Sequence, residues 1–427
     1  MNVTVIGLGY IGLPTAAMLA CAGHTVRGFD VDERLITDLR LGLVSTQEAP
    51  VRDLVTQAIR RGTFRAGTSV EPSDVFIICV PTPALHGRPD LRCVIDALRR
   101  VVAVVRPGDA IVLESTVPPG TTERLVTEEL RAAGIIPDAV RVAHCPERVI
   151  PGAIVEELRG NARVIGGRRP SDAAFVAGLY ASFCRGEILQ TDCMTAELTK
   201  CVENTYRDVN IAFANELAML AEDLGVDVYE TIALANRHPR VDILMPGPGV
   251  GGHCIPVDPH FLTDANPFVT ELIQSARRVN ERMPHRIVSR ICARLPHATA
   301  GSKIAVLGAA YKADVDDARE SPTERIVELL EQRGFTASIY DPLVRSFRFP
   351  LTATLEEALR GADAVVLATG HAVFRAIEPH RAAKLMRGTL LFDARNALDA
   401  ELWEAAGFEV AVLGRPSRDR VARAMTA

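Results

Sequence analysis

The sequence predicts an α/β protein in which two doubly wound domains are joined by a central helical domain with a long spine helix. Two observations predict this class. Short apolar runs alternate with helical patterns in residues 1–190 and again in residues 298–427, and such runs are typical of parallel strands covered on both faces. Residues 191–297 between them contain helical patterns and one loop rich in Gly and Pro.

The first domain is expected to begin with a strand, a helix and a second strand. Residues 2–26 contain no Lys, Arg, Asp or Glu, which also fits a signal peptide or membrane anchor. No basic residue precedes the stretch, however, and glycines and a proline interrupt it, so a dinucleotide-binding βα unit is favoured. The expected strands span residues 2–7, 25–30, 75–80, 110–115, 140–145 and 163–167, and the first helix spans residues 12–22.

The central domain is expected to be helical. Residues 194–224 contain neither Gly nor Pro, which predicts one long helix that ends at Gly225. A helical segment between two sheet domains is suited to serve as a spine and as a dimer surface. Further helices are expected over residues 227–236 and 267–294, and strands of the last domain within residues 301–312, 336–341, 364–369 and 390–395.

The composition is that of an ordinary globular protein. Hydrophobic residues make up 48% of the 427 residues and charged residues 24%. The net charge of -5 and the absence of a long Lys/Arg run argue against a nucleic-acid or membrane partner. Nine scattered cysteines without CxxC or metal-ligand spacing indicate reduced thiols, a cytoplasmic protein and no metal site.

Gly7, Gly9 and Gly12 form a G-x-G-x-x-G motif between the first strand and the first helix. In this motif the first glycine makes the turn, the second lets a pyrophosphate approach the backbone, and the third lets helix and strand pack closely. Asp30 ends the second strand, 18 residues after Gly12, where a carboxylate would hold ribose hydroxyls and repel a 2′-phosphate. The pattern predicts a Rossmann-like domain that binds NAD; a Gly-rich turn beside a surface Asp is the alternative.

Two further loops lie just past strand carboxyl ends, where ligands bind in such sheets. They are CVPTP at residues 79–83 and ESTVPPGTT at residues 114–122. The hydroxyls of Thr82 and Thr116 are placed to meet a nicotinamide or a catalytic water, and ordinary turn chemistry is the alternative. The residues expected to bind the cofactor are Gly7, Gly9, Tyr10, Ile11, Gly12, Asp30, Arg34, Pro81, Thr82 and Thr116.

The loop GPGVGGHCIPVDP at residues 247–259 surrounds Cys254 with Gly and Pro. Such a stretch suits neither a helix nor a regular strand. It would hold a thiol at a fixed point in a cleft. The alternative is a tight connection in which the cysteine is a small buried apolar residue.

Six segments occur in one order, namely GLGYIGLP, CVPTP, ESTVPPGTT, AELTKCVENTYRDVNIAFANE, GPGVGGHCIPVDP and YKADVDDARESP. Their combination resembles the UDP-glucose/GDP-mannose dehydrogenase family of nucleotide-sugar dehydrogenases over essentially the whole chain. That family oxidises the C6 alcohol of a nucleotide sugar to a carboxylate with two NAD+ and a catalytic cysteine. The resemblance therefore implies a UDP-sugar substrate and NAD as cofactor.

The resemblance also implies roles for single residues. Cys254 is the nucleophile that captures an aldehyde as a thiohemiacetal, which is oxidised to a thioester and hydrolysed. Lys200 and Asn204, four residues apart on one helix face, contact the reacting sugar, with Lys200 stabilising the oxyanion; without the resemblance they would be a solvated face. Asp258 and Glu147 manage protons and water, Glu147 as a candidate general base. The catalytic set is Cys254, Lys200, Asn204, Asp258, Glu147 and Thr116.

The last domain is implied to hold the nucleotide end of the substrate. Its segment at residues 312–321 matches the family, with Lys312 toward the diphosphate or sugar, and Arg395 also facing the site. Arg240 matches a stretch that in related enzymes reaches the neighbouring subunit's substrate, which implies a homodimer, and Arg277 is a weaker candidate. The expected substrate contacts are Glu147, Arg148, Lys200, Asn204, Arg240, Gly251, Lys312 and Arg395.

The segment at the nucleophile bears on the choice of sugar. Residues 254–258 read CIPVD, which departs from the Cys-Phe-Pro-Lys-Asp pattern of the UDP-glucose branch. By resemblance, CPERVIPG and NRHPRV imply UDP-N-acetyl-D-mannosamine rather than UDP-N-acetylglucosamine as the substrate. The implied product, UDP-N-acetyl-D-mannosaminuronate, is a precursor of bacterial surface polysaccharide. Two other classes stay open: a non-catalytic NAD-binding protein, and a one-step alcohol dehydrogenase that would not need Cys254.

Overall fold

The computed structural model describes residues 1–46, 48–85, 87–150, 152–295 and 301–416. By internal contacts the chain forms two compact units, each described by itself. The first unit contains Met1–Glu203 and His260–Pro267, and the second contains Asn204–Pro259 and Phe268–Ala427. The predicted division into three domains, with boundaries at residues 190 and 297, stays a prediction.

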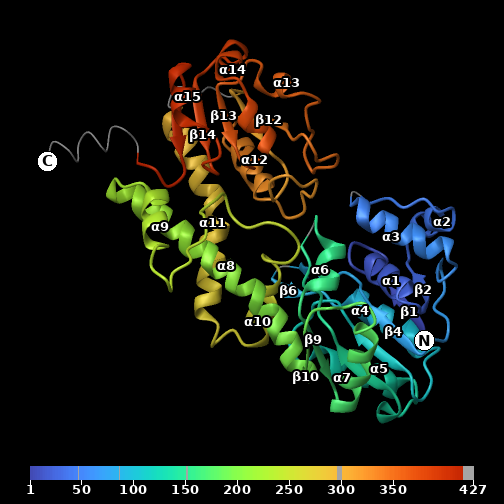
Figure 1. The fold of residues 1–427 in the computed structure, drawn as a ribbon. Coiled ribbons are helices and arrows are strands. Elements are labelled where there is room, and N and C mark those ends of the chain that lie inside the picture. Colours follow the sequence, from blue (N-terminus) through green and yellow to red (C-terminus); the bar gives the residue numbers. More distant parts are fainter. Residues whose placement is uncertain (47, 86, 151, 296–300, 417–427) are drawn as a thin grey trace. The chain divides into compact units, whose positions relative to one another are not determined.

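The first unit is built on an eight-stranded sheet with the order β10-β9-β8-β7-β4-β1-β2-β3 (Figure 1). Its strands pair in parallel except for β8 with β9. Six of them follow the 3-2-1-4-5-6 order of a dinucleotide-binding fold, whose order reverses between β1 and β4. The strands are β1 Asn2–Ile6, β2 Thr25–Phe29, β3 Phe64–Gly67, β4 Val75–Ile78, β7 Ala110–Leu113, β8 Arg141–His144, β9 Arg163–Gly167 and β10 Ile188–Asp192, with a hairpin of β5 Ala84–Leu85 and β6 Arg88–Pro89.

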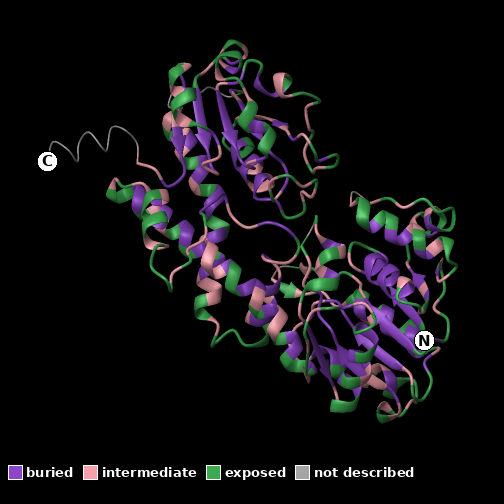
Figure 2. Cartoon of the chain, in the orientation of Figure 1, coloured by how far each residue is buried: buried purple, intermediate pink, exposed green. Residues whose placement is uncertain are grey.

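Both faces of this sheet are covered, as the apolar runs predicted. Val75 and Ile77 of β4 belong to one buried cluster, whereas Phe76 and Ile78 belong to another. Figure 2 shows the strands as buried and the outward helix faces as exposed. The helices are α1 Gly12–Cys21, α2 Glu33–Arg40, α3 Ala49–Arg60, α4 Arg92–Val102, α5 Thr121–Ala132, α6 Ile154–Gly160 and α7 Pro170–Tyr180, with the 3-10 turn η1 Pro137–Ala139.

The second unit combines long helices with a five-stranded parallel sheet. The sheet order is β12-β11-β13-β14-β15, so its order reverses between β11 and β13. The strands are β11 Lys303–Leu307, β12 Thr336–Tyr340, β13 Ala364–Leu367, β14 Leu390–Asp393 and β15 Glu409–Val412. The helices are α8 Cys193–Leu224, which begins in the first unit, α9 Val228–Ala235, α10 Asp258–Ala265, which belongs to the first unit from His260 onward, α11 Glu271–Arg294, α12 Pro322–Gln332, α13 Leu355–Leu359, α14 Pro379–Leu385 and α15 Ala400–Ala405, with the 3-10 turn η2 Ala372–Ala376.

The predicted fold class is confirmed, with two doubly wound sheets and a spine helix, α8, of 32 residues. Two details were wrong. The loop around Cys254 ends earlier than expected, because α10 begins at Asp258 and Pro259 stands in its first turn, where the missing proline N–H costs no helical hydrogen bond. The following helix begins at Glu271 rather than at residue 267.

None of the helices in the described part of the chain is long and apolar enough to cross a membrane.

Candidate active site

The glycine loop joins β1 to α1 at the point where the strand order of the first sheet reverses. Gly7 has a φ of +89°, and a Cβ built there would lie 2.5 Å from the carbonyl oxygen of Cys79. A Cβ on Gly12 would lie 1.8 Å from the carbonyl oxygen of Gly7, so this position must be glycine for the turn to close. A Cβ on Gly9, in contrast, would meet no atom within 4 Å. The space over Gly9 is therefore open to a ligand.

The structure also orients Asp30 toward this loop. Its Oδ2 accepts a hydrogen bond from the backbone N–H of Leu8 at 2.7 Å, and its Oδ1 accepts one from Asp32 at 2.9 Å. Helix α1 begins without a side-chain cap, which leaves its first turn to a phosphate group. Open space, a helix N-terminus and a carboxylate after β2 are the features that a bound NAD requires.

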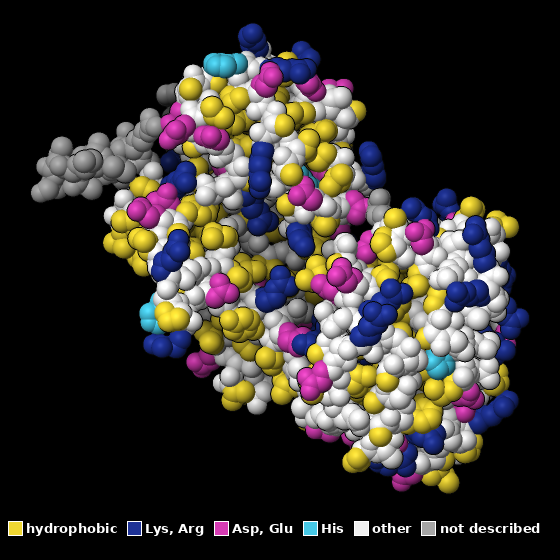
Figure 3. Space-filling model, in the orientation of Figure 1, with side chains coloured by type: hydrophobic (Ala, Val, Ile, Leu, Met, Phe, Trp, Pro, Cys, Tyr) yellow, Lys and Arg dark blue, Asp and Glu magenta, His cyan; other side chains and the backbone are white. Residues whose placement is uncertain are grey.

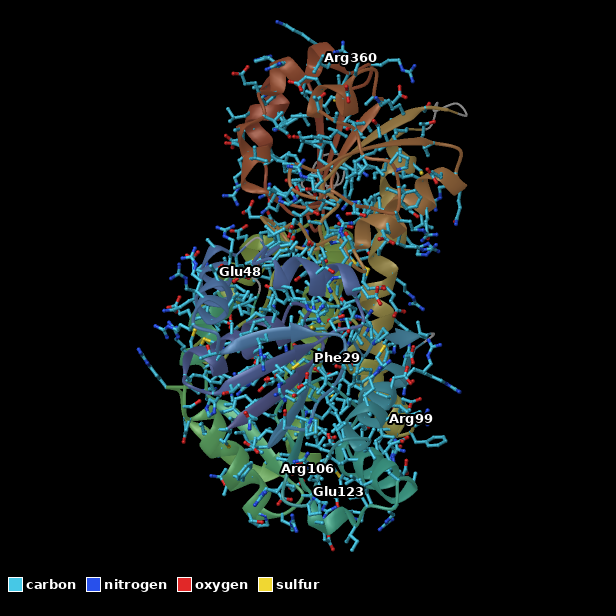
Figure 4. All side chains as sticks on the ribbon, turned by 90° about the vertical axis from the view of Figure 1, so that its right-hand side faces the viewer. Phe29, Glu48, Arg99, Arg106, Glu123 and Arg360 are labelled. Carbon is cyan, nitrogen blue, oxygen red and sulfur yellow. The ribbon has the colours of Figure 1, made fainter. Side chains whose placement is uncertain are left out.

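Three further residues predicted to bind the cofactor are exposed or half-buried. Tyr10 is exposed, and its hydroxyl donates to the carboxylate of Glu48 at 2.9 Å, a residue labelled in Figure 4. Ile11 is half-buried and precedes α1. Arg34 is exposed in the first turn of α2, where its backbone N–H is capped by Asp32. These three residues stay predictions.

The two loops after β4 and β7 are brought together. The hydroxyl of Thr82 donates to the carbonyl oxygen of Thr116 at 2.6 Å, and the hydroxyl of Ser115 donates to that of Val80 at 2.7 Å. Pro81 is exposed beside them. Thr82 thus has its proton engaged within the protein, while Thr116 is half-buried.

A buried ionic cluster lies behind Glu147, which follows β8. The guanidinium of Arg163 in β9 contacts Glu147 at 3.2 Å and Glu114, which follows β7, at 3.4 Å. Burial raises the pKa of Glu114 to about 7, with the charge of Glu147 adding to the shift and Arg163 opposing it. The sequence analysis missed Glu114 and Arg163. The available signal was a charge inside or directly after an apolar run, because burial of an unpaired charge is costly.

Arg148 and Lys200 complete the predicted residues of the first unit. Arg148 is engaged by the protein, since it pairs with Glu203 at 2.5 Å and donates to the carbonyl oxygen of Ala162 at 3.0 Å. Lys200 is half-buried on α8. Burial, together with the charge of Lys200, lowers the pKa of His144 to about 3, so this imidazole is neutral beside the ammonium.

In the second unit, the loop that carries Cys254 packs against residues 311–322. A Cβ on Gly251 would lie 2.6 Å from the carbonyl oxygen of Glu320, and one on Gly252 would lie 3.0 Å from the ring of Tyr311. The backbone N–H of Gly252 donates to the carbonyl oxygen of Arg319 at 3.0 Å. Glycine is needed here because a side chain would separate the two segments.

Cys254 precedes the turn of residues 255–257 that leads into α10. Its carbonyl oxygen accepts from the backbone N–H groups of Val257 at 3.0 Å and Asp258 at 2.9 Å. The buried carboxylate of Asp258 in turn accepts from the side-chain amide of Asn204 at 2.5 Å. Three predicted catalytic residues, Cys254, Asn204 and Asp258, are thereby joined within one unit. His253 is exposed.

The second sheet presents Lys312 and Arg395 at its carboxyl edge. Lys312 is exposed in the loop after β11, and Arg395 follows β14 and donates to the carbonyl oxygen of Tyr311 at 3.5 Å. Burial lowers the pKa of Arg395 to about 10, with Tyr229 and Asp393 opposing the shift. Both cations lie beside the reversal in strand order, where such sheets bind ligands.

Asp341, which follows β12 as Asp30 follows β2, has different hydrogen-bond partners from Asp30. Asp341 accepts hydrogen bonds from the backbone N–H groups of Ala309 and Ala310 and from the buried ring of His371 at 3.0 Å. This carboxylate is therefore committed to the protein, and the second sheet does not repeat the ribose site of the first.

Two predicted arginines are placed less favourably. Arg277 is buried, and it pairs with Asp208 at 2.7 Å and Glu281 at 3.3 Å, so its guanidinium is committed to the protein. Arg240 is exposed.

The predicted residues of the segment after β11 contact one another or cap a helix. Asp317 and Arg319 form an ion pair at 2.6 Å, and Ser321 is the N-cap of α12.

Charged side chains of both signs are mixed on the molecular face drawn in Figure 3. Figure 3 shows Lys and Arg side chains interspersed with Asp and Glu. Among the residues that the structure describes, no group of three or more His, Cys, Asp or Glu side chains is arranged to hold a metal ion.

Comparison with known proteins matches all three parts of the chain to one family. The models of the UDP-glucose/GDP-mannose dehydrogenase family match residues 1–184 with its NAD binding domain, residues 194–282 with its central domain and residues 305–400 with its UDP binding domain. The predicted cofactor, NAD, and the predicted UDP-sugar class of substrate agree with these domains.

Relatives and solved structures cover nearly the whole chain. The UDP-N-acetyl-D-mannosamine dehydrogenase of Methanocaldococcus jannaschii is 43% identical over 420 residues, which cover 97% of this chain and 96% of that protein. The NDP-N-acetyl-D-galactosaminuronic acid dehydrogenase of Ralstonia nicotianae is 42% identical, and the match covers 94% of this chain and 97% of that protein. The structure of UDP-D-ManNAc dehydrogenase from Pyrococcus horikoshii superposes with a TM-score of 0.92 at 41% identity, and the match covers 97% of this chain and 99% of that chain. The chain therefore belongs to the UDP-glucose/GDP-mannose dehydrogenase family.

Proposed function

We propose that this protein is an NAD-dependent 6-dehydrogenase that oxidises the C6 alcohol of UDP-N-acetyl-D-mannosamine to the carboxylate of UDP-N-acetyl-D-mannosaminuronate. The observation that carries this proposal is the packing of the Cys254 loop against residues 311–322 within one unit. This packing sets a candidate nucleophile beside the domain that matches UDP binding.

NAD, when bound, supplies a hydride acceptor and is used twice per sugar. Gly9 and the start of α1 would hold its pyrophosphate, and Asp30 its adenosine ribose. Thr116 lies in the loop after β7, at the carboxyl edge of the sheet, and would face the nicotinamide end of the cofactor.

Cys254 divides the oxidation into steps that balance in atoms and electrons. The alcohol first loses a hydride and a proton and becomes an aldehyde. The Cys254 thiolate adds to that carbonyl carbon, and the oxygen takes a proton to give a thiohemiacetal. Loss of a second hydride and a proton gives a thioester, which water cleaves to the carboxylate and the free thiol.

The other predicted catalytic residues would act on oxygen and water. Lys200 would stabilise the oxyanion that forms at the reacting carbon, because an ammonium favours developing negative charge. Asn204 would hold Asp258, which it contacts at 2.5 Å, and Asp258 would move protons near Cys254. Glu147 would take a proton from the attacking water during thioester hydrolysis.

The substrate's diphosphate would be bound by the cations at the edge of the second sheet. Lys312 and Arg395 supply positive charge there, and the guanidinium of Arg395 donates to the backbone carbonyl oxygens of Ala368 and Tyr311. Gly251 would let the sugar approach the backbone. Arg148 forms an ion pair with Glu203, so its role would be to fix the loop that contacts the sugar.

The sugar itself is inferred from relatives. Proteins named UDP-N-acetyl-D-mannosamine dehydrogenase match at up to 43% identity, but a dehydrogenase named for N-acetyl-D-galactosaminuronic acid matches at 42%. UDP-N-acetylglucosamine and UDP-glucose are the alternative substrates. A non-catalytic NAD-binding role is less favoured because all of the catalytic residue types are present.

We also propose a homodimer in a reducing, cytoplasmic compartment. The nine cysteines are scattered without CxxC or metal-ligand spacing, which fits that compartment. Exposed apolar side chains recur along one stripe of α8, and a second copy of this helix would cover them. We call this stripe the α8 apolar face; it consists of Met194, Leu198, Val202, Tyr206, Phe213, Leu220 and Leu224. Arg240 would then reach the partner's substrate.

The test is a count of NADH formed per sugar consumed, with the pure protein and a panel of UDP-sugars. Two NADH per UDP-N-acetyl-D-mannosamine is the expected result. One NADH per sugar would indicate a simple alcohol dehydrogenase, and no turnover with any sugar would indicate a binding protein. Cys254→Ser should abolish formation of the acid and leave NAD binding intact; full activity in this variant would refute the covalent route.

A further inference from the structure

Three elements of the first unit, the loop after β4, strand β9 and helix α7, each bring one side chain to the buried carboxyl group of Glu114. Cys79 after β4 donates its thiol to Glu114 Oε2 at 2.9 Å, and Tyr180 on α7 donates its hydroxyl to Glu114 Oε1 at 3.3 Å. Arg163 in β9 contacts the same Oε1 at 3.4 Å. Glu114 and Tyr180 have side chains that are fully buried or nearly so, and Arg163 is 5% exposed.

Arg163 bridges this carboxyl group to Glu147. Its Nη1 and Nη2 approach Glu147 Oε2 at 3.3 and 3.2 Å, and Nη1 also approaches Cys145 Sγ at 3.7 Å. The guanidinium lies over the ring of Tyr180 with its central carbon 4.7 Å from the centroid. One cation is therefore shared by two carboxyl groups in a buried site.

We infer that Arg163 is a positioning residue that orients Glu147, and that Glu114 is a buried proton-exchanging partner whose charge decides how strongly Arg163 holds Glu147. This inference deepens the proposed function, because it rests on Glu147 acting as the base. Neither Glu114 nor Arg163 touches the substrate in this account. Both act through the Glu147 carboxylate.

The geometry supports the role of Arg163 directly. A guanidinium is planar and presents several N–H groups, so it can serve two carboxylates at once, which a lysine ammonium does less well. The Nε of Arg163 has no hydrogen-bond partner among the described residues, so the guanidinium uses its two terminal nitrogens for this purpose. A side chain fixed in this way holds Glu147 at one orientation.

The charge state of Glu114 follows from its surroundings. Burial raises its pKa to about 7, and the neighbouring charge of Glu147 acts in the same direction, whereas Arg163 and the hydrogen bonds from Cys79 and Tyr180 lower it. Burial also raises the pKa of Cys79 and of Tyr180 well above their usual values and that of Cys145 to about 12. Among Glu114, Cys79, Tyr180 and Cys145, Glu114 is therefore the group whose pKa lies near neutral pH.

The charge of Glu114 changes how tightly Arg163 holds Glu147. Below pH 7 Glu114 carries a proton, and Arg163 neutralises Glu147 alone. Above that pH Glu114 is an anion that competes with Glu147 for Arg163, so Arg163 holds the Glu147 carboxylate less tightly and leaves it more accessible to the attacking water. Activity that depends on Glu147 should therefore rise as the pH passes through about 7.

The first experiment does not depend on activity. Infrared spectra of the whole protein with isotope-labelled glutamate should show a protonated carboxyl band at pH 6 that disappears near pH 7 to 8, in accord with the pKa of about 7. The band should be absent in Glu114→Gln. A titration that is the same in the wild type and in Glu114→Gln would overturn the inference.

The second experiment compares pH profiles of kcat. Glu114→Gln cannot ionise and should lack the rise near neutral pH, with kcat lower on the order of threefold at pH 9 and little changed at pH 6. Glu129→Gln is the matched control, since Glu129 pairs at 3.3 Å with Arg99, which Figure 4 labels at the outside of the unit. A profile of wild-type shape in Glu114→Gln would refute the role of Glu114.

Arg163→Lys tests the positioning role separately. This variant keeps the positive charge but loses the planar guanidinium that contacts two carboxyl groups at once. The kcat should therefore fall on the order of tenfold, while KM for NAD and for the sugar stays nearly constant. Unchanged kcat in a folded variant would overturn the role of Arg163. If the wild type oxidises no nucleotide sugar, the proposed function fails, whereas the infrared titration still decides whether Glu114 exchanges its proton.

Discussion

Asn204 on α8 donates its side-chain amide to the carboxylate of Asp258 at 2.5 Å, which ties the spine helix to the first residue of α10. Both side chains are buried, with exposed fractions of 8% and 3%. Because Cys254 accepts from the backbone N–H of Asp258, this hydrogen bond also fixes one end of the cysteine loop.

Asn204→Ala should therefore weaken both stability and activity. A hydrogen bond to a charged group contributes about 1.5–3 kcal/mol, so the free energy of unfolding in urea should fall by roughly that amount. The kcat should fall as well, because the Cys254 loop loses an anchor. Asn210→Ala on the same helix is the control, since Asn210 contacts only the backbone of Tyr206 in the described hydrogen bonds. Equal stability of the two variants would contradict the role given to Asn204.

Gly9 and Gly12 should respond differently to alanine. A Cβ at Gly12 would lie 1.8 Å from a backbone oxygen, so Gly12→Ala should destabilise the first unit by about 1–3 kcal/mol or more. A Cβ at Gly9 would meet nothing within 4 Å, so Gly9→Ala should melt like the wild type but bind NAD at least about tenfold more weakly. Thermal melts and NAD titrations measure both effects. Undiminished NAD affinity in Gly9→Ala would place the pyrophosphate elsewhere.

Asp30→Asn should shift the preference between cofactors. The amide oxygen can still accept from Leu8, but the negative charge that holds ribose hydroxyls and repels a 2′-phosphate is gone. We expect KM for NAD to rise about tenfold and the ratio of NADP to NAD activity to increase. Asp32→Asn, which keeps a cap on α2, is the control. A constant ratio in Asp30→Asn would argue against the assigned ribose contact.

The α8 apolar face can be tested with charges. Tyr206→Glu combined with Phe213→Glu should convert a dimer to a monomer in light scattering, because burying unpaired carboxylates in an interface is costly. Both side chains are exposed, by 65% and 50%, so the substitutions should leave the fold of the protomer intact. Ile136→Glu, at an exposed position of the first unit, should not change the mass. A monomeric wild type would refute the proposed homodimer.

Much of the fold could be predicted because its signals are local. Strands β1, β4 and β7 are apolar runs, the long helix α8 lacks Gly and Pro, and the spacing of the glycines follows from one turn. The helix α10 was missed because Gly and Pro dominate the preceding loop, and Pro259 was counted as a loop residue rather than as a helix start. The resemblance to the family was equally readable, since it depends on the order of short motifs.

The sequence by itself determined the class of fold, the glycine loop with Asp30, and the family to which the chain belongs. Only the tertiary structure decided which charged groups meet. Glu114, Glu147 and Arg163 follow or lie in different strands, and no spacing along the chain records that one guanidinium is shared by two carboxyl groups in a buried site. The physical reason is that a strand pattern reports which residues are buried, whereas contacts between charges depend on how the strands are ordered in the sheet.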